Sequence, residues 1–186
     1  MSSTRLITCA VIAFSATTIA RSQVAAQQHA HGTVHAEIPA SIREEHAAIH
    51  QELEQATAAP GRVGAAARAL AAVLHPHFVR EEQIALPPLG LLAPLARGEH
   101  DPGMRNVLPM TDSLRAELPR MLEEHRAIRA ATLKLLTEAR AARNARVTRL
   151  AEQLALHAKT EEEVYYPAAV LVGDVVRATG AAGGAH

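Results

Sequence analysis

Residues 77–87 read HFVREEQIALP, and residues 157–167 read HAKTEEEVYYP. Both stretches contain His-x-x-x-Glu-Glu followed five residues later by a proline, so one motif occurs twice with a spacing of 80 residues (157 − 77). A histidine and a glutamate four residues apart lie one above the other on a helix. Each copy therefore directs an imidazole and a carboxylate toward the same side of a helix.

A second pair of matching segments precedes the first pair. Residues 44–50 read EEHAAIH, and residues 123–129 read EEHRAIR. His46 stands 31 residues before His77, and His125 stands 32 residues before His157. The same two segments in the same order indicate an internal repeat, in which each half of the chain contributes two helices.

The composition favours helices over strands. The chain is rich in Ala, Leu, Glu and Arg, and it contains only two Phe, two Tyr and no Trp. Strands draw on β-branched and aromatic residues, whereas Ala, Leu, Glu and Arg favour helices. The formal net charge is zero at pH 7, without a basic stripe interleaved with aromatic residues, so we expect no nucleic-acid partner. No phosphate-binding glycine loop or nucleophile–base pair points to nucleotide or hydrolase chemistry.

Hydrophobic periodicity predicts four helices, at about 41–59, 63–86, 112–142 and 144–176. The residues expected on their inner faces are Ile42, His46, Ile49 and Leu53; Leu70, Val73, His77, Glu81 and Ile84; Leu118, Met121, Leu122, His125, Ile128, Thr132 and Leu136; and Leu150, Leu154, His157, Glu161, Val164 and Ala168. Ser41 and Glu44 form a capping-box pattern, and Asn144 is a predicted N-cap. The connections are short, long and short. We therefore predict an all-α, up-down-up-down four-helix bundle with a pseudo-twofold internal repeat.

Six polar residues lie near the middle of these inner faces, at a comparable depth: His46, His77, Glu81, His125, His157 and Glu161. A buried carboxylate costs several kcal/mol unless it is paired, and no Lys or Arg lies at the centre of the four faces. Imidazole and carboxylate ligands suit iron, manganese and zinc. Two carboxylates from opposite helices can bridge two cations about 3.5–4 Å apart. We therefore predict a dinuclear metal site, and a purely structural polar core is the alternative.

The four segments resemble the hemerythrin-like domain, also called the HHE cation-binding domain, over about residues 38–176. The resemblance rests on Glu45-His46, the motif from His77 to Pro87, the segment from Glu124 to Ile128, and the motif from His157 to Pro167. It implies a non-haem centre of two iron ions, with or without an oxo bridge, that binds oxygen or reacts with oxygen, peroxide or nitric oxide. It also implies that the four histidines are terminal ligands and that Glu81 and Glu161 bridge the irons. Other divalent metals remain open.

One position departs from the oxygen carriers of this family. They have a fifth histidine one turn after the histidine of the third helix, where this chain has Arg129. Here His50 stands one turn after His46 instead. Two interpretations stay open: His50 is a fifth histidine ligand, or the site has four His and two Glu. The second set occurs in hemerythrin-like proteins linked to iron-centre repair and iron sensing.

Four further residues are expected beside the ligands rather than on the metals: Arg129, Glu82, Glu162 and Tyr165. Arg129 is expected to pair with Glu82 or Glu162. Tyr165 and Tyr166 follow Glu161 by about one turn, so we expect them to pack with a hydroxyl at the edge of the site. The matching residues of the first half are Ala85 and Leu86, so the two halves differ here.

The N-terminal residues 1–26 have the pattern of an export signal. Arg5 precedes an apolar run over residues 6–20, and small residues precede Gln27. The run is shorter than the roughly 18–20 apolar residues that span a bilayer. We therefore expect cleavage, a periplasmic or extracellular location and no stable membrane span, and an uncleaved anchor is the alternative. Cys9, the single cysteine, would leave with the signal.

Three further segments complete the predicted organisation. Residues 27–37 are expected to be a flexible linker that contains histidines, residues 38–178 the bundle, and residues 179–186 a flexible tail. Loose metal capture by the linker histidines is a side hypothesis.

The leading functional hypothesis is an exported protein with two non-haem irons that binds or senses oxygen or a related diatomic molecule. A binding role is favoured over an enzymatic one. The alternatives are an enzyme that consumes peroxide or nitric oxide at the same centre, a protein for metal storage or delivery outside the cytoplasm, and a purely structural bundle. The sequence does not indicate an oligomeric state.

Overall fold

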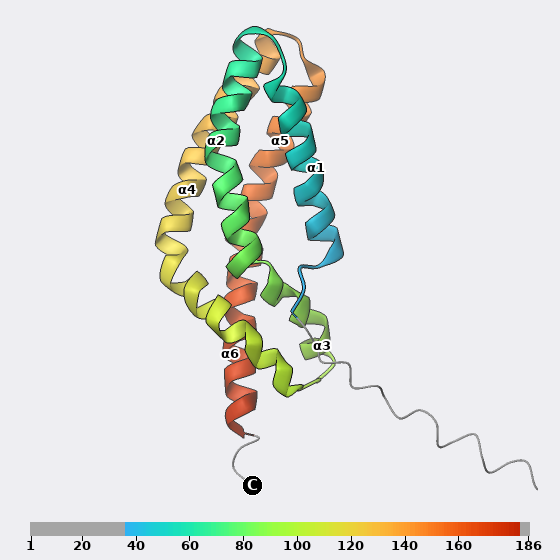
Figure 1. The fold of residues 1–186 in the computed structure, drawn as a ribbon, viewed down its shortest axis with the longest axis vertical. Helices are drawn as coiled ribbons and strands as arrows, with labels where there is room; N and C mark the ends of the chain where they lie inside the picture. The colour runs from blue at the N-terminus through green and yellow to red at the C-terminus, as the bar shows by residue number, and fades with distance from the viewer. Residues whose placement is uncertain (1–35, 183–186) are drawn as a thin grey trace, which may run out of the picture. The chain divides into compact units, whose positions relative to one another are not determined.

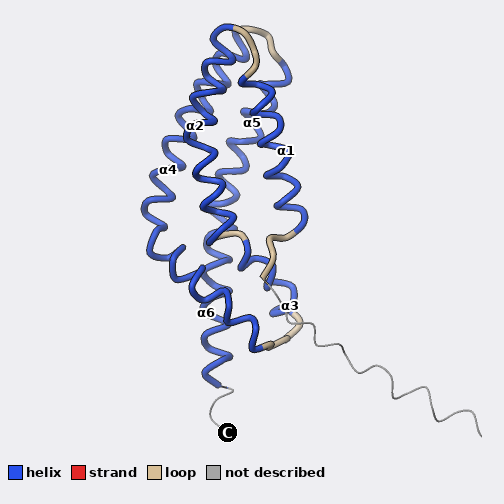
Figure 2. Tube along the Cα trace, viewed as in Figure 1, coloured by secondary structure: helices blue, strands red, loops and turns tan. Residues whose placement is uncertain are grey.

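The computed structural model describes residues 36–182, which fold into helices and short connections without any strand in that range (Figure 2). The long helices are α1 (Ala40–Thr57), α2 (Gly61–Ile84), α4 (Leu108–Ala141) and α5 (Ala145–Thr160). After α5 the chain continues through a π-helical segment, η3 (Glu161–Tyr165), directly into α6 (Tyr166–Ala182). Together α5, η3 and α6 form the fourth long helix.

The four long helices run in alternating directions (Figure 1). Helix α1 packs against α2 and α5, and α4 packs against the same two helices, so α1 and α4 lie diagonally opposite each other. The predicted all-α four-helix bundle is confirmed, and its helices follow one another up, down, up and down. This arrangement lets each of the four helices direct side chains into one shared interior.

A polar layer separates two of the three apolar clusters that the described residues form. One cluster includes Leu53, Leu70 and Leu150, and the other includes Leu114 and Tyr166. The six predicted polar residues lie between these clusters along every helix, and each is no more than 3% exposed. Burying a leucine stabilises the fold by about 1.5–3 kcal/mol. The apolar packing on both sides therefore holds the polar layer at one depth in the bundle.

The π-helical segment η3 changes which residues face inward. The backbone N–H of Tyr166 donates to the carbonyl of Glu161, five residues earlier, so the turn contains one more residue than an α-helical turn. Val164, which we predicted on the inner face, is 53% exposed for this reason. Tyr166 is 1% exposed and lies on the inner face below Glu161. The prediction for Val164 is wrong because regular helical periodicity does not account for the extra residue.

Other local predictions had mixed outcomes. The Ser41 capping box is wrong, because α1 begins at Ala40 after Pro39 and has no side-chain cap. The Asn144 cap is confirmed, because its side chain accepts a hydrogen bond of 3.1 Å from the backbone N–H of Val147. Val73 was predicted to face inward but is 37% exposed, because the inner face of α2 passes through Leu74 instead.

The connection between the halves is more ordered than a loop. It forms the short helices η1 (Pro87–Leu91), α3 (Leu92–Ala96) and η2 (Pro102–Val107) before α4 begins. Four residues of η1 are buried: Pro87, Pro88, Leu89 and Leu91. A side chain at Gly90 would place its Cβ 2.1 Å from the carbonyl oxygen of Glu37. Glycine is therefore needed for the segment that leads into α1 to pass close to η1.

The predicted signal at residues 1–26 and nearly all of the linker at 27–37 lie outside the described residues. At the other end, residues 179–182 continue α6, although we predicted them as part of a flexible tail. Within residues 36–182, no helix combines the length and the apolar character needed to cross a membrane.

Candidate metal centre

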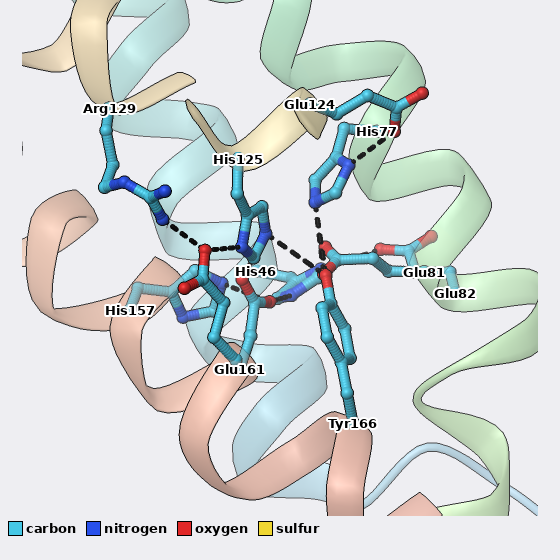
Figure 3. Close-up of polar contacts among 11 residues, drawn as sticks. His46, His77, Glu81, Glu82, Glu124, His125, Arg129, His157, Glu161 and Tyr166 are labelled. Carbon is cyan, nitrogen blue, oxygen red and sulfur yellow. Dashed lines mark hydrogen bonds and ion pairs between the residues drawn. The ribbon is translucent and has the colours of Figure 1, made fainter. Parts of the chain in front are cut away.

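The structure brings the six predicted ligands together in the polar layer (Figure 3). They form two groups, and within each group one ligand atom from every residue lies within 4.8 Å of the others. Subsite A consists of His77, Glu81, His125 and Glu161. Subsite B consists of His46, His157 and Glu161. The two subsites therefore share one carboxylate.

Glu161 presents a different oxygen to each subsite. Its Oε1 lies 2.9 Å from Nε2 of His157 and 3.4 Å from Nε2 of His46. Its Oε2 lies 3.5 Å from Nε2 of His125. A carboxylate in this position can bind one cation through each oxygen. Glu161 could therefore contribute to a cation site on each side.

Glu81 belongs to subsite A. Its Oε1 lies 3.3 Å from Nε2 of His77 and 3.9 Å from Nε2 of His125. Its Oε2 is buried and has no hydrogen-bond partner within the described part of the chain. The second oxygen is therefore available to a cation.

Each of the four histidines directs Nε2 inward and Nδ1 toward a glutamate on a neighbouring helix. The Nδ1-to-oxygen distances are 3.3 Å for His46–Glu82, 2.9 Å for His77–Glu124, 2.8 Å for His125–Glu162 and 3.2 Å for His157–Glu45. The first three pairs have hydrogen-bond geometry, and the fourth is an ion-pair contact without it. An Nδ1–H that donates to a carboxylate leaves the Nε2 lone pair free for a metal.

Two of these outer glutamates were predicted from the sequence and two were not. Glu82 and Glu162 were expected beside the ligands, whereas the roles of Glu45 and Glu124 were missed. The signal that could have found them is the glutamate immediately before each of the histidines at 46 and 125. Consecutive residues of a helix are about one quarter-turn apart. The glutamate before an inward-facing histidine therefore points toward the next helix.

Two arginines reinforce the outer glutamates of subsite A alone. Arg129 donates to Glu162, one of the two partners expected for it, and Arg120 donates to Glu124 over 2.8 Å. Burial opposes ionisation, but the hydrogen bonds from histidine and arginine lower the pKa of both carboxyls below its ordinary value. Within residues 36–182, Glu45 and Glu82 make no ion pair with an arginine. The two subsites therefore differ in their surrounding charge.

The subsites also differ in their aromatic neighbours. The hydroxyl oxygen of Tyr166 lies 3.1 Å from Nε2 of His125 and 3.3 Å from Nε2 of His77 in subsite A. In subsite B, the ring of Phe78 stacks on His46 with a centroid distance of 4.1 Å. Tyr165 packs against the apolar cluster around Leu114. Burial raises the pKa of its hydroxyl, and the charges of Glu45 and Glu161 raise it further. The extra residue in η3 directs Tyr166 toward the ligand atoms of subsite A.

His50 is not brought into either group. Its ring contacts Phe78 and His75, with centroid distances of 5.0 and 5.1 Å. Phe78 occupies the space beside His46, so His50 lies on the outer side of that ring. The structure thus assembles four histidines and two glutamates, without the fifth histidine considered from the sequence.

The electrostatics of the layer fit a cation. Burial raises the pKa of Glu81, and the nearby charge of Glu161 raises it further. Burial also opposes ionisation of Glu161, but hydrogen bonds with His125, His157 and His46 hold its pKa well below its usual range. Both ring nitrogens of His157 lie within the ion-pair distances given above, yet neither makes a hydrogen bond within the described residues. A neutral imidazole has one acceptor nitrogen, and a buried acceptor without a donor suits metal ligation.

Four antiparallel helices around a buried set of histidines and carboxylates define a class of metal-binding helical bundles. The family model described as the hemerythrin HHE cation-binding domain matches residues 37–169, and the chain belongs to this family. No curated protein and no solved structure matched the chain. The family and the buried cluster together indicate binding of iron or another metal cation.

Proposed function

We propose that the chain holds two iron ions, one in each subsite, and binds or senses oxygen or a related diatomic molecule there. The observation that carries this proposal is the position of Glu161, which offers one oxygen to each subsite. A pair of irons, when bound, would supply a redox-active centre with a coordination position for a small ligand. The outer glutamates hold the imidazoles in the orientation that ligation requires.

The repeat supports the same proposal. Exchanging the two halves of the chain converts the His46–Glu82 contact into the His125–Glu162 contact. The same exchange relates the His77–Glu124 contact to the His157–Glu45 contact. These matched contacts support the pseudo-twofold organisation and two metal positions of similar construction.

The proposal is tested by iron analysis of the purified protein, with optical spectra recorded anaerobically and then in oxygen. We expect about two irons per chain and a spectrum that reverses when oxygen is removed. Absence of iron, with tight binding of zinc or copper instead, would overturn the di-iron proposal. Loss of added peroxide over many turnovers would overturn the binding role in favour of an enzyme. Bound iron that does not respond to oxygen would indicate storage or delivery.

A pair of variants examines the bridging role. Glu161→Ala removes an oxygen from both subsites and should abolish binding of the metal pair. Glu163→Ala is the matched control, because Glu163 lies in the same segment and its side chain is 63% exposed. The control should retain two irons. Two irons in Glu161→Ala would show that the ligand assignment is mistaken.

We also propose that the protein is exported to the periplasm or the cell exterior, as the pattern of residues 1–26 suggests. Intact mass measurement of protein purified from its export compartment should give a chain that starts at Gln27. Full-length protein in the membrane fraction would favour the anchor instead.

A further inference from the structure

Tyr166 is buried, and its hydroxyl reaches the ligand atoms of the site. It is 1% exposed, and its hydroxyl oxygen lies within hydrogen-bond distance of atoms from His77, Glu81 and His125. All three residues belong to subsite A. The phenol oxygen thus converges with the other ligand atoms of that subsite (Figure 3).

The hydrogen bonds around this hydroxyl cannot all be made when both imidazoles are in the neutral Nδ1–H form that ligation requires. A phenol has one O–H to donate, and it donates to Oε1 of Glu81. The Nδ1 atoms of His77 and His125 face Glu124 and Glu162, so an Nδ1–H tautomer leaves each Nε2 as an acceptor. Two acceptor nitrogens then face an oxygen whose proton is already used. The lone pairs of the two nitrogens and the oxygen then repel one another. A cation among these three atoms would attract all of them.

The local structure of the chain brings this oxygen to the site. The π-helical segment η3 places Tyr166, rather than Tyr165, below Glu161. π-Helical turns are rare and are frequently found at functional sites. The matching residue in the first half is Leu86, which is fully buried and apolar. Among residues 36–182, such an additional oxygen therefore reaches subsite A and not subsite B.

We propose that Tyr166 is a ligand of the metal in subsite A and binds it through the phenolate oxygen. The inference rests on the proposed pair of irons. On ligation the O–H bond breaks, an oxygen–metal bond forms and the proton leaves to solvent, without any change in oxidation state. Subsite A then has His77, His125 and Tyr166 in addition to its carboxylates. Subsite B has fewer protein ligands. Its metal is therefore the one that would take the external diatomic molecule.

The charges and the shape of the two subsites agree with this division. A phenolate and two carboxylates give subsite A three anionic ligands. The guanidinium groups of Arg120 and Arg129 stand behind its outer glutamates and offset part of that charge. Subsite B lies against the apolar ring of Phe78, which contacts both His46 and His157. An apolar wall suits an uncharged diatomic molecule.

Resonance Raman spectroscopy of the ferric protein tests the proposal. An iron-bound phenolate gives a charge-transfer band in the visible region and enhanced tyrosinate ring modes, which shift when ring-deuterated tyrosine is incorporated. The chain has two tyrosines, so any such signal in Tyr165→Phe comes from Tyr166. We expect the signal in the wild type and in Tyr165→Phe, and its loss in Tyr166→Phe. The measurement on Tyr165→Phe is decisive even if Tyr166→Phe does not fold.

Azide, titrated into the ferric protein, provides a second readout. We expect one azide per chain in the wild type and in Tyr165→Phe, and a second azide in a folded Tyr166→Phe as subsite A opens. Two irons per chain without a tyrosinate signal would overturn the role of Tyr166 and leave the proposed function standing. Fewer than two irons in the wild type would overturn the proposed function itself.

Discussion

The glutamates outside the ligand set orient the histidines for metal binding. Each imidazole has one nitrogen directed at the centre and the other held near a carboxylate on the next helix. The six central residues could be predicted because histidine and glutamate interrupt apolar stripes at regular spacing. A tyrosine hydroxyl at the edge of the site could be predicted as well. The position of the Tyr166 oxygen among the ligand atoms could not, since an aromatic residue on an apolar stripe has the pattern of a core residue.

Replacing an outer glutamate should weaken the metal at the histidine that it holds. Glu124→Gln removes the charged partner of His77 Nδ1, and such changes typically cost about 10–100-fold in metal affinity. We expect a loss of this size for one of the two metals, measured by chelator competition with zinc. Glu123→Gln is the control, because Glu123 is 69% exposed and pairs with Arg126 instead. Equal affinities for the two variants would contradict this role.

At the scale of the elements, η3 is where sequence-based prediction fails. The expected inner face followed a constant helical repeat, but one extra residue in the turn rotates Val164 outward and Tyr166 inward. Nothing in the residue types of this segment signals the extra residue. The order and number of the long helices could be predicted because their apolar stripes are long and end at proline, glycine or an N-cap.

Deleting one residue from η3 should restore an α-helical turn without changing the residues that face inward. Removing Glu163 leaves Tyr166 four residues after Glu161, which is the spacing that shares a face of an α-helix. We therefore expect the shortened chain to fold and to retain two metals, as shown by metal analysis and circular dichroism. Deleting Lys159 instead breaks the spacing between His157 and Glu161 and should abolish metal binding. Loss of the metals in both deletions would show that the widened turn itself is required.

The crossing of α4 and α6 depends on a glycine. A Cβ at Gly173 would lie 2.3 Å from Oγ1 of Thr111, which is buried in α4. Gly to Ala in a helix normally stabilises by roughly 0.5–1 kcal/mol, but overpacking costs about 1–3 kcal/mol. We expect Gly173→Ala to lower the free energy of unfolding measured in urea. Gly180→Ala, whose Cβ would meet only the flexible end of Arg105, should be neutral or stabilising, and the opposite order would contradict this packing.

At the scale of the whole molecule, metal binding should be coupled to pH and to stability. In the metal-free chain, burial opposes protonation of His77, but its hydrogen bonds to Glu81 and Glu124 and the charges of Glu81 and Glu161 raise its pKa from 6.5 to about 9. The protonated imidazole therefore stabilises the metal-free fold fully below pH 6.5, and this contribution is lost as the pH rises through about 9. Ligation needs the neutral imidazole, so a metal must displace that proton.

The rise in melting temperature on adding zinc should therefore be larger near pH 9 than at pH 6.5. Thermal unfolding at the two pH values, with and without zinc, measures this difference. His100→Gln is a suitable control, because His100 is exposed in the connection between the halves and should leave the pH dependence unchanged. A zinc effect that is equal or larger at pH 6.5 would contradict the coupling.

The proposed function requires two metals side by side with Glu161 between them. Anomalous diffraction at the iron edge, from crystals of the iron-loaded protein, locates each metal. We expect two peaks, one beside His77 and His125 and the other beside His46 and His157. A single peak, or a peak at the His50–His75 contact instead, would contradict it.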